Sequence, residues 1–291
     1  MDIELVGVAG AGFMGSGIAE SVARAGFGVV LYEPERAPLE RSRAAIAASV
    51  ERAVATGKLD GAEQEALLGR IRHTTQLDDL EPADLVVEAV YEDPTVKGRL
   101  FKALDDLLAP EAILASNTSS IPIAQLASWT SEPGRVLGLH FFSPVPIMKL
   151  VEVVVGLDTT STVVERSEQL VRRMGKHPIR TKDRSGFIVN VLLVPYLMAA
   201  VRMYEDGFAS REDIDSGMQL GAGHPMGPLT LCDFIGLDVL YSVCDSLYEE
   251  FKRPEYAPPP LLKRMVVAGH HGRKSGRGFY EYVPAAASVA A

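Results

Sequence analysis

The sequence predicts an α/β protein: a Rossmann-type, mostly parallel sheet domain followed by an all-α domain. Three observations predict this fold class. Strand-like apolar segments alternate with helical patterns through residues 1–185, and a glycine-rich turn follows the first of these strands. From residue 186 the hydrophobic periodicity is helical almost to the end of the chain. We therefore expect two domains, residues 1–185 and 186–291, with a boundary near Ser185.

Length and composition limit the classes of function. The chain has 291 residues, enough for two domains with cores of their own. The net charge of −9 argues against nucleic acid or an anionic membrane as the main partner. Cys232 and Cys244 are the only cysteines, without metal-ligand spacing, so we expect no metal, no disulfide and a cytoplasmic location. The longest apolar stretch, 188–201, is too short to cross a membrane.

The first strand, residues 3–9, runs into a glycine-rich turn, a helix to residue 25 and a second strand that finishes at Glu33. The turn has the spacing G-x-G-x-x-G and consists of Gly10, Ala11, Gly12, Phe13, Met14 and Gly15. Placed between a strand and a helix, this spacing predicts a dinucleotide site with the pyrophosphate at the helix N-terminus. Glu33 can accept hydrogen bonds from both ribose hydroxyls and would repel a 2′-phosphate, which favours NAD over NADP.

The following segments continue the α/β alternation: helices 35–57 and 62–69, strands 71–74 and 84–89, helix 95–108 and strand 113–115. The arginines of helix 35–57 form either a solvated face or a basic surface for a phosphate-bearing ligand arm. Residues 116–120, Ser-Asn-Thr-Ser-Ser, follow a strand at the sheet edge where ligands bind in α/β proteins. The same polar residues could also simply cap the next helix.

Residues 136–155 are the most informative part of the chain for chemistry. Two β-branched apolar runs flank a turn that contains Pro144 and Pro146. If the runs pair antiparallel about this turn, His140 and Glu152 come opposite each other, with Cβ atoms about 5 Å apart. An imidazole held by a carboxylate is a suitable general base near neutral pH. The alternative is a strand-end histidine and an exposed glutamate that never meet.

After this stretch we expect helix 161–174 and strand 177–180, which complete the first domain. The second domain is predicted to hold four helices, 187–206, 211–220, 228–251 and 259–268. A basic, glycine-rich turn over 272–278 then leads into a short strand, and the tail 284–291 is expected to be disordered.

Taken together, these motifs resemble the L-3-hydroxyacyl-CoA dehydrogenase family, especially its short bacterial 3-hydroxybutyryl-CoA dehydrogenases. The resemblance covers nearly the whole chain in family order, at residues 10–19, 84–89, 116–120, 140–153, 186–190, 220–228 and 272–280. It implies an NAD-dependent oxidoreductase that interconverts (S)-3-hydroxyacyl-CoA and 3-oxoacyl-CoA, with a short acyl chain such as that of 3-hydroxybutyryl-CoA. It further implies a cytoplasmic homodimer, joined through the helical domain, that acts in fatty acid metabolism.

The resemblance also implies a role for individual residues. His140 would be the catalytic base, Glu152 its carboxylate partner, and Ser119 and Asn190 the groups that hold the substrate oxygen. The implied NAD contacts, beside the glycine-rich turn, are Glu33, Glu92, Lys97, Ser119, Ser143 and Lys274. Ser143 stands where the family usually has Asn. Ser49 matches a contact to the CoA arm, and Lys58 lies two residues beyond Thr56, on which the neighbouring family lysine falls.

Two other functions remain to be compared. One is the dehydrogenation of a free 3-hydroxy acid or sugar acid without CoA, since related glycine motifs also occur there. The β-hydroxyacid dehydrogenases use a catalytic lysine, for which Lys176 is the nearest candidate. The other is an NAD-binding structural or sensor protein. The pairing of His140 with Glu152 argues against the β-hydroxyacid dehydrogenases. The coexistence of His140, Glu152, Ser119 and Asn190 argues against the NAD-binding structural or sensor protein.

Overall fold

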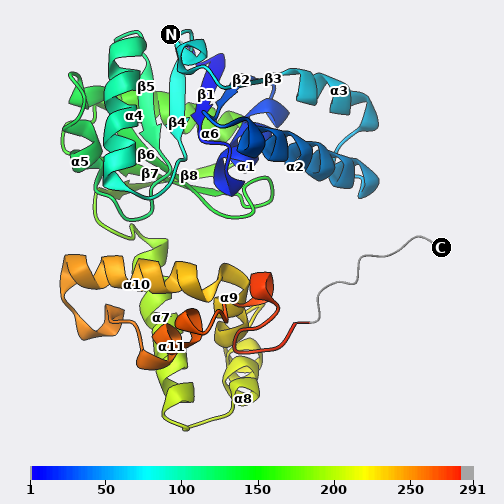
Figure 1. Cartoon of the computed structure of the whole chain (residues 1–291), viewed down its shortest axis with the longest axis vertical. Helices are drawn as coiled ribbons and strands as arrows, with labels where there is room; N and C mark the ends of the chain where they lie inside the picture. Colours follow the sequence, from blue (N-terminus) through cyan, green and yellow to red (C-terminus); the bar gives the residue numbers. More distant parts are fainter. Residues whose placement is uncertain (1, 283–291) are drawn as a thin grey trace. The chain divides into compact units, whose positions relative to one another are not determined.

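The computed structural model describes residues 2–282 and separates into two compact units that divide between Phe187 and Ile188 (Figure 1). The tail 284–291, which was expected to be disordered, lies outside the described residues. None of the helices within 2–282 combines the length and the apolar character that a membrane crossing requires.

The first unit is built on one eight-stranded sheet with the strand order β3-β2-β1-β4-β5-β6-β7-β8. Every neighbouring pair is parallel except β6 and β7, which are antiparallel. The first six strands have the usual order of a dinucleotide-binding sheet, which confirms the predicted fold class. The strands are β1 (Leu5–Ala9), β2 (Gly28–Tyr32), β3 (Ile71–Thr74), β4 (Leu85–Glu88), β5 (Ile113–Ser116), β6 (Val136–Phe141), β7 (Leu150–Val155) and β8 (His177–Lys182).

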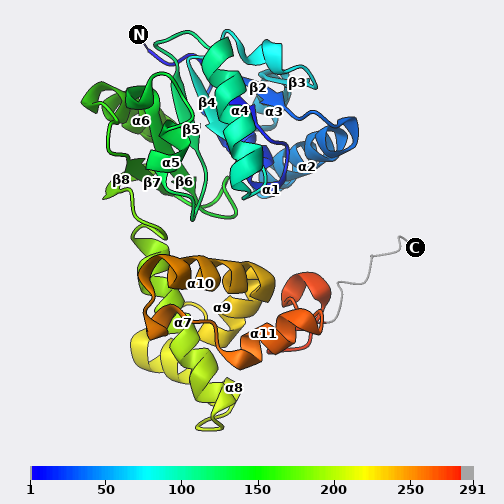
Figure 2. The same ribbon diagram turned by 60° about the vertical axis from the view of Figure 1, so that its left-hand side comes forward.

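Helices cover both faces of this sheet, so its central strands are buried on both sides (Figure 2). Apolar side chains of α1 and α6 pack on one face, and those of α4 and α5 pack on the other. The continuous apolar runs of the sequence follow from this two-sided burial. The helices are α1 (Phe13–Arg24), α2 (Arg36–Ala55), α3 (Gly61–Gly69), α4 (Pro94–Leu107), α5 (Ile123–Ala127) and α6 (Ser161–Arg173).

Because β1, β2, β4, β5 and β6 run in the same direction, their carboxyl ends lie along one edge of the sheet. The segments that leave these ends carry most of the residues singled out from the sequence. They are the glycine-rich turn after β1, Glu33 after β2, Glu92 after β4, residues 117–120 after β5, and His140 within the end of β6. In open α/β sheets, ligands bind at this edge.

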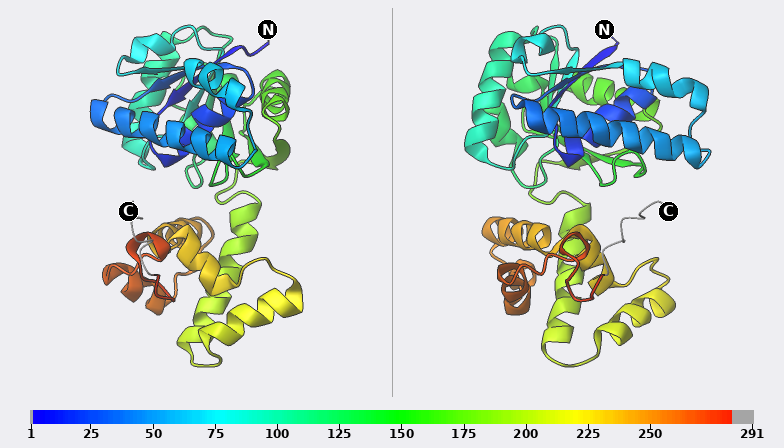
Figure 3. Two further views of the ribbon diagram at one scale, coloured as in Figure 1. Left: turned by 90° about the vertical axis from the view of Figure 1, so that its right-hand side faces the viewer. Right: turned by 45° about the vertical axis from the view of Figure 1, so that its right-hand side comes forward.

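The second unit is helical and has a core of its own, formed by residues such as Leu197, Leu229 and Leu240. Figure 3 shows α7 running through this unit with other helices on either side of it. Its helices are α7 (Val189–Glu205), α8 (Arg211–Ser216), α9 (Pro228–Ile235), α10 (Leu237–Phe251) and α11 (Pro260–Val267).

Three details of this unit differ from the prediction. The single helix expected over 228–251 is two helices, because Gly236 has a φ of 103° and breaks the helical path. The described residues of this unit therefore contain five α-helices in place of four. The helix expected over 211–220 ends at Ser216 and continues as a π-helical turn, Gly217–Gly221. The short strand expected after residue 278 is reduced to isolated bridges around Arg277.

Candidate active site

The glycine-rich turn has the geometry of a phosphate cradle. Gly10 has a φ of 111°, and a Cβ on Gly15 would lie 1.9 Å from the Gly10 carbonyl oxygen. A Cβ on Gly12 would instead meet no atom within 4 Å, which leaves the approach to the backbone open. Helix α1 begins after Gly12 without a side-chain cap or an acidic residue in its first turn. Its free N–H groups therefore suit the pyrophosphate of a dinucleotide.

Glu33 lies beside this cradle at the end of β2. Its carboxylate Oε2 accepts a hydrogen bond from the Ala11 N–H at 3.1 Å, so the acid is tied to the glycine-rich turn. The Gly10 N–H donates to the Tyr32 carbonyl at 2.8 Å, which fixes the same turn against β2. The structure thus brings Glu33 next to the turn, in the position from which a carboxylate can bind ribose hydroxyls.

A buried charge cluster underlies the next part of the edge. Lys97 on α4 is 1% exposed, and its Nζ donates to both oxygens of Glu88, at 2.7 and 2.8 Å. The same Nζ lies 3.0 Å from Oε2 of Glu92. Burial opposes ionisation of Glu92, but the Lys97 ammonium and hydrogen bonds from Thr118 and Ser120 outweigh it and lower the pKa of Glu92. Lys97 is therefore held inside the cluster by two carboxylates.

Glu92 in turn organises the loop that carries Ser119. Its Oε1 accepts from the N–H groups of Ser119 and Ser120, at 3.1 and 3.2 Å, and from the hydroxyls of Thr118 and Ser120. The Ser119 hydroxyl has no hydrogen-bond partner within residues 2–282 and remains available to a ligand. The polar loop is thus held from within by Glu92, and Ser119 is its free hydroxyl.

His140 and Glu152 meet as the hairpin symmetry predicted. The two residues are directly opposite in the antiparallel β6–β7 register, and His140 Nδ1 lies 2.7 Å from Glu152 Oε2. A carboxylate can only accept, so Nδ1 carries the hydrogen and Nε2 is left to exchange a proton. Glu152 is fully buried, His140 is 7% exposed, and the rings of Phe142 and Phe187 flank the imidazole at 4.7 and 5.3 Å.

The turn between β6 and β7 carries Ser143, which is exposed. Lys176, the alternative catalytic lysine, is not free to act as a base there. Its Nζ donates to the carbonyls of Val145 and Met148 in this turn, at 2.5 and 2.8 Å. Burial and the charge of Arg24 lower the pKa of Lys176 to about 8, while Glu20 opposes the shift. Lys176 is therefore a buried hydrogen-bond donor to the backbone of the turn.

The remaining predicted site residues lie elsewhere. Ser49 is half-buried on α2, and Lys58 is exposed just beyond the end of that helix. The hydroxyl of Thr56 donates to the Arg52 carbonyl at 2.9 Å. Asn190 and Lys274 belong to the second unit: Asn190 lies in the first turn of α7, and Lys274 Nζ pairs with Asp238 at 2.6 Å.

Two residues of the segments 84–89 and 116–120 have supporting contacts that the sequence did not predict. Asn117 Oδ1 accepts from the Phe141 N–H at 2.9 Å and so ties the Ser119 loop to the end of β6, next to His140. Glu88, the last residue of β4, accepts a hydrogen bond from the Ser116 hydroxyl at 2.6 Å, in addition to those from Lys97. An acid that ends a buried strand was the available signal for Glu88, since charged residues are rarely buried without a partner.

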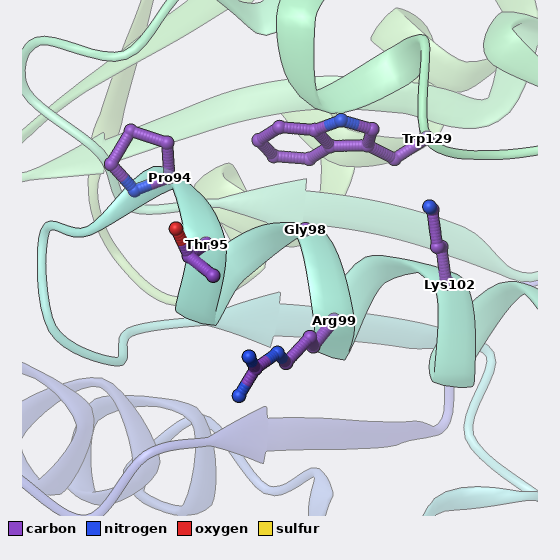
Figure 4. A pocket seen from close by; sticks show the side chains of 6 residues that line it. All are labelled: Pro94, Thr95, Gly98, Arg99, Lys102 and Trp129. Carbon is purple, nitrogen blue, oxygen red and sulfur yellow. The ribbon is translucent and has the colours of Figure 1, made fainter.

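A hollow of about 300 Å³ also lies on the outer side of α4. Figure 4 shows the Trp129 ring over Gly98, where a Cβ would come within 3.2 Å of the indole. Arg99 points away from that ring in the same view, so the polar side chains do not converge as they do in ligand sites. The residues that line the hollow are Pro94, Thr95, Gly98, Arg99, Lys102 and Trp129.

Comparisons with known proteins agree with this geometry. Family models for the NAD binding domain and the C-terminal domain of 3-hydroxyacyl-CoA dehydrogenase match residues 5–184 and 186–282. The chain is 53% identical to a 3-hydroxybutyryl-CoA dehydrogenase of Mycobacterium tuberculosis over 96% of this chain and 99% of that protein. A crystal structure of M. tuberculosis FadB2, also 53% identical, superposes with a TM-score of 0.96 over 97% of this chain and 100% of the other. For an (S)-3-hydroxybutyryl-CoA dehydrogenase from Ralstonia eutropha, identity is 43% and the TM-score 0.93, over the same shares of the two chains.

Proposed function

Because this chain belongs to the 3-hydroxyacyl-CoA dehydrogenase family of NAD-dependent oxidoreductases, we propose that it interconverts (S)-3-hydroxybutyryl-CoA and acetoacetyl-CoA. The observation that carries the chemical part of the proposal is the 2.7 Å contact between His140 Nδ1 and Glu152 Oε2. It supplies an oriented base at the sheet edge that also holds the dinucleotide cradle. The short acyl chain follows the names of the relatives.

In the oxidation direction, Nε2 of His140 accepts the proton of the substrate 3-hydroxyl while the hydrogen on C3 leaves with two electrons as hydride. NAD supplies the hydride acceptor when it is bound. Glu152 stabilises the imidazolium that forms and keeps the ring in one orientation. Ser119 and Asn190 hydrogen-bond the oxygen that becomes the carbonyl. In reduction His140 returns the proton.

The cofactor residues of the proposal that belong to the first unit lie along the same edge. The turn Gly10–Gly15 binds the pyrophosphate, and Glu33 binds the ribose hydroxyls. Glu92, Lys97 and Ser119 shape the next part of the site, with Lys97 acting through the carboxylate of Glu92. Ser143 in the β6–β7 turn and Lys274 of the second unit complete the set.

The substrate and assembly assignments rest on the family. Ser49 and Lys58 contact the CoA arm, and the helical domain, residues 186–291, contributes to binding of the acyl substrate. We further propose a homodimer formed through that domain and a cytoplasmic role in fatty acid metabolism.

An assay with two carbonyl substrates tests the function directly. With NADH in excess, acetoacetyl-CoA should be reduced with a higher kcat/KM than free acetoacetate, because only the thioester offers the CoA arm to Ser49 and Lys58. The loss of NADH absorbance measures both rates, because NADH is consumed in each reduction. Activity on the free acid alone would establish the dehydrogenase without CoA, and activity on neither would favour an NAD-binding protein.

The cofactor preference should depend on Glu33. Replacing it by alanine removes a charged hydrogen-bond acceptor, worth about 1.5–3 kcal/mol. The ratio of kcat/KM for NADH over NADPH should therefore fall by about 10- to 100-fold. Glu35→Ala is the matched control, since Glu35 is exposed two residues further on. An unchanged ratio in Glu33→Ala would remove Glu33 from the cofactor site.

A further inference from the structure

Lys176 is a buried lysine that the proposed mechanism does not use. It follows Gly175, whose φ of 70° turns the chain away from the helical path of α6, and it directly precedes β8. Only 9% of the residue is exposed. A buried lysine normally has an ion-pair or hydrogen-bond partner for its ammonium, because removing the charge from water costs free energy.

The ammonium of Lys176 forms hydrogen bonds with the turn between β6 and β7, residues 142–149. It donates to the carbonyls of Val145 and Met148, at 2.5 and 2.8 Å. Within the turn itself, the N–H groups of Ile147 and Met148 both donate to the Pro144 carbonyl at 3.0 Å. Lys176 thus satisfies carbonyls that the short turn does not satisfy by its own backbone.

The turn also packs against α1, the helix that begins at the dinucleotide cradle. A Cβ on Gly17 would lie 2.9 Å from Cβ of Val145, which is almost fully buried. Glu20 and Arg24 on the same helix act on Lys176 electrostatically and pair with each other at 2.7 Å. The turn is therefore held in two ways: the Lys176 hydrogen bonds tie it to the segment that precedes β8, and the close approach of Val145 to Gly17 packs it against α1.

We propose that Lys176 is a positioning residue for hydride transfer: by hydrogen-bonding the 142–149 turn, it fixes Ser143 and His140 relative to the cofactor cradle. This inference rests on the proposed function. His140 lies two residues before the turn and Ser143 lies inside it. A displacement of the turn would therefore move both groups together, and misplacements of about 1 Å can cost about 100-fold in rate.

A positioning role differs from a general-base role in its response to pH. The pKa of Lys176 is lowered to about 8 by burial and Arg24, with Glu20 opposing. A neutral amine still carries two hydrogens, one for each carbonyl, so the turn stays held above and below that pH. The ratio of wild-type kcat to that of Lys176→Met should therefore be constant between pH 7 and pH 9. A lysine that acted as a base would change that ratio in this range.

The decisive experiment compares Lys176→Met with Lys149→Met, which makes the same change at an exposed lysine at the end of the turn. In the reduction of acetoacetyl-CoA, Lys176→Met should lower kcat by about 10- to 100-fold. It should also raise the isotope effect on kcat with NADH deuterated at the transferred position, because hydride transfer becomes slower than product release. The NADH dissociation constant should change far less than kcat. Lys149→Met should match the wild type in all three.

Two measurements keep the inference separate from folding and from the proposed function. Hydrogen–deuterium exchange should rise in the peptide 142–149 of Lys176→Met while β1 and β4 stay protected. Gly17→Ala, which displaces Val145 without touching Lys176, should reproduce the kinetic signature. Wild-type kcat and isotope effect in Lys176→Met would overturn the positioning role, as would unchanged exchange of the turn. A wild-type chain inactive on acetoacetyl-CoA would overturn the proposed function, and the exchange experiment would still decide whether Lys176 holds the turn.

Discussion

Replacing His140 by alanine should lower kcat for acetoacetyl-CoA reduction by about 10²–10⁴-fold, the range typical of general acid–base assistance. The expectation follows from the ring geometry. Nδ1 is occupied by Glu152 at 2.7 Å, so Nε2 is the nitrogen that can exchange a proton with the substrate oxygen. NADH binding, followed by the change in its fluorescence, should persist, because the glycine-rich turn and Glu33 belong to other strands.

Alanine also leaves the fully buried Glu152 without its imidazole partner, so part of any loss could come from a changed fold. His140→Gln addresses this, because its amide can still donate to the carboxylate but cannot act as a base near neutral pH. Both variants should lose activity to a similar extent, whereas His73→Gln on β3 should behave as the wild type. Near-full turnover in His140→Gln would contradict the catalytic assignment.

The features that the sequence predicted well are those in which neighbouring residues set the geometry. The antiparallel contact of His140 and Glu152 follows from a period of two along each strand and from a turn midway between them. The glycine-rich turn likewise depends on a local backbone path, with Gly10 at a φ of 111°. In both cases the pattern and the contact lie within one short segment, so spacing alone was sufficient.

The features that the sequence could not predict arise where distant segments meet. Lys176 reaches carbonyls 28 and 31 residues away, and no periodicity marks that contact. Lys97 was expected only as an NAD contact implied by the resemblance, and its burial against Glu88 depends on how α4 packs beside β4. The break at Gly236 was missed because apolar periodicity continues through it, and a glycine alone does not end a helix.

His140 and Lys97, both at the carboxyl edge of the sheet, need different measurements. The role proposed for His140 is catalytic and should be tested by the reaction rate, while Lys97 is buried beneath the edge and should be tested first by stability. One ammonium neutralises Glu88, which is 1% exposed, and also contacts Glu92. The loop of Ser119 is held by Glu92, so the charge cluster links the stability of the sheet edge to the placement of the hydroxyl that we propose binds the substrate.

Lys97→Met should lower the free energy of unfolding of the first unit by about 3–5 kcal/mol, because it leaves the Glu88 carboxylate buried without a counter-charge. Urea denaturation followed by circular dichroism measures the loss. Lys102→Met is the matched control, on the same helix with an exposed side chain that forms no ion pair within residues 2–282, and it should change the free energy by less than about 0.5 kcal/mol.

A double variant separates the lost charge pair from lost packing. In the wild type, the Ser116 hydroxyl donates to Glu88 at 2.6 Å. Glu88→Gln removes the buried charge, and its amide can still hydrogen-bond that hydroxyl. If the unpaired carboxylate causes the loss, Glu88→Gln combined with Lys97→Met should be more stable than Lys97→Met alone. Equal or lower stability of the double variant would show that Lys97 contributes through the packing of its aliphatic stem and not through its charge.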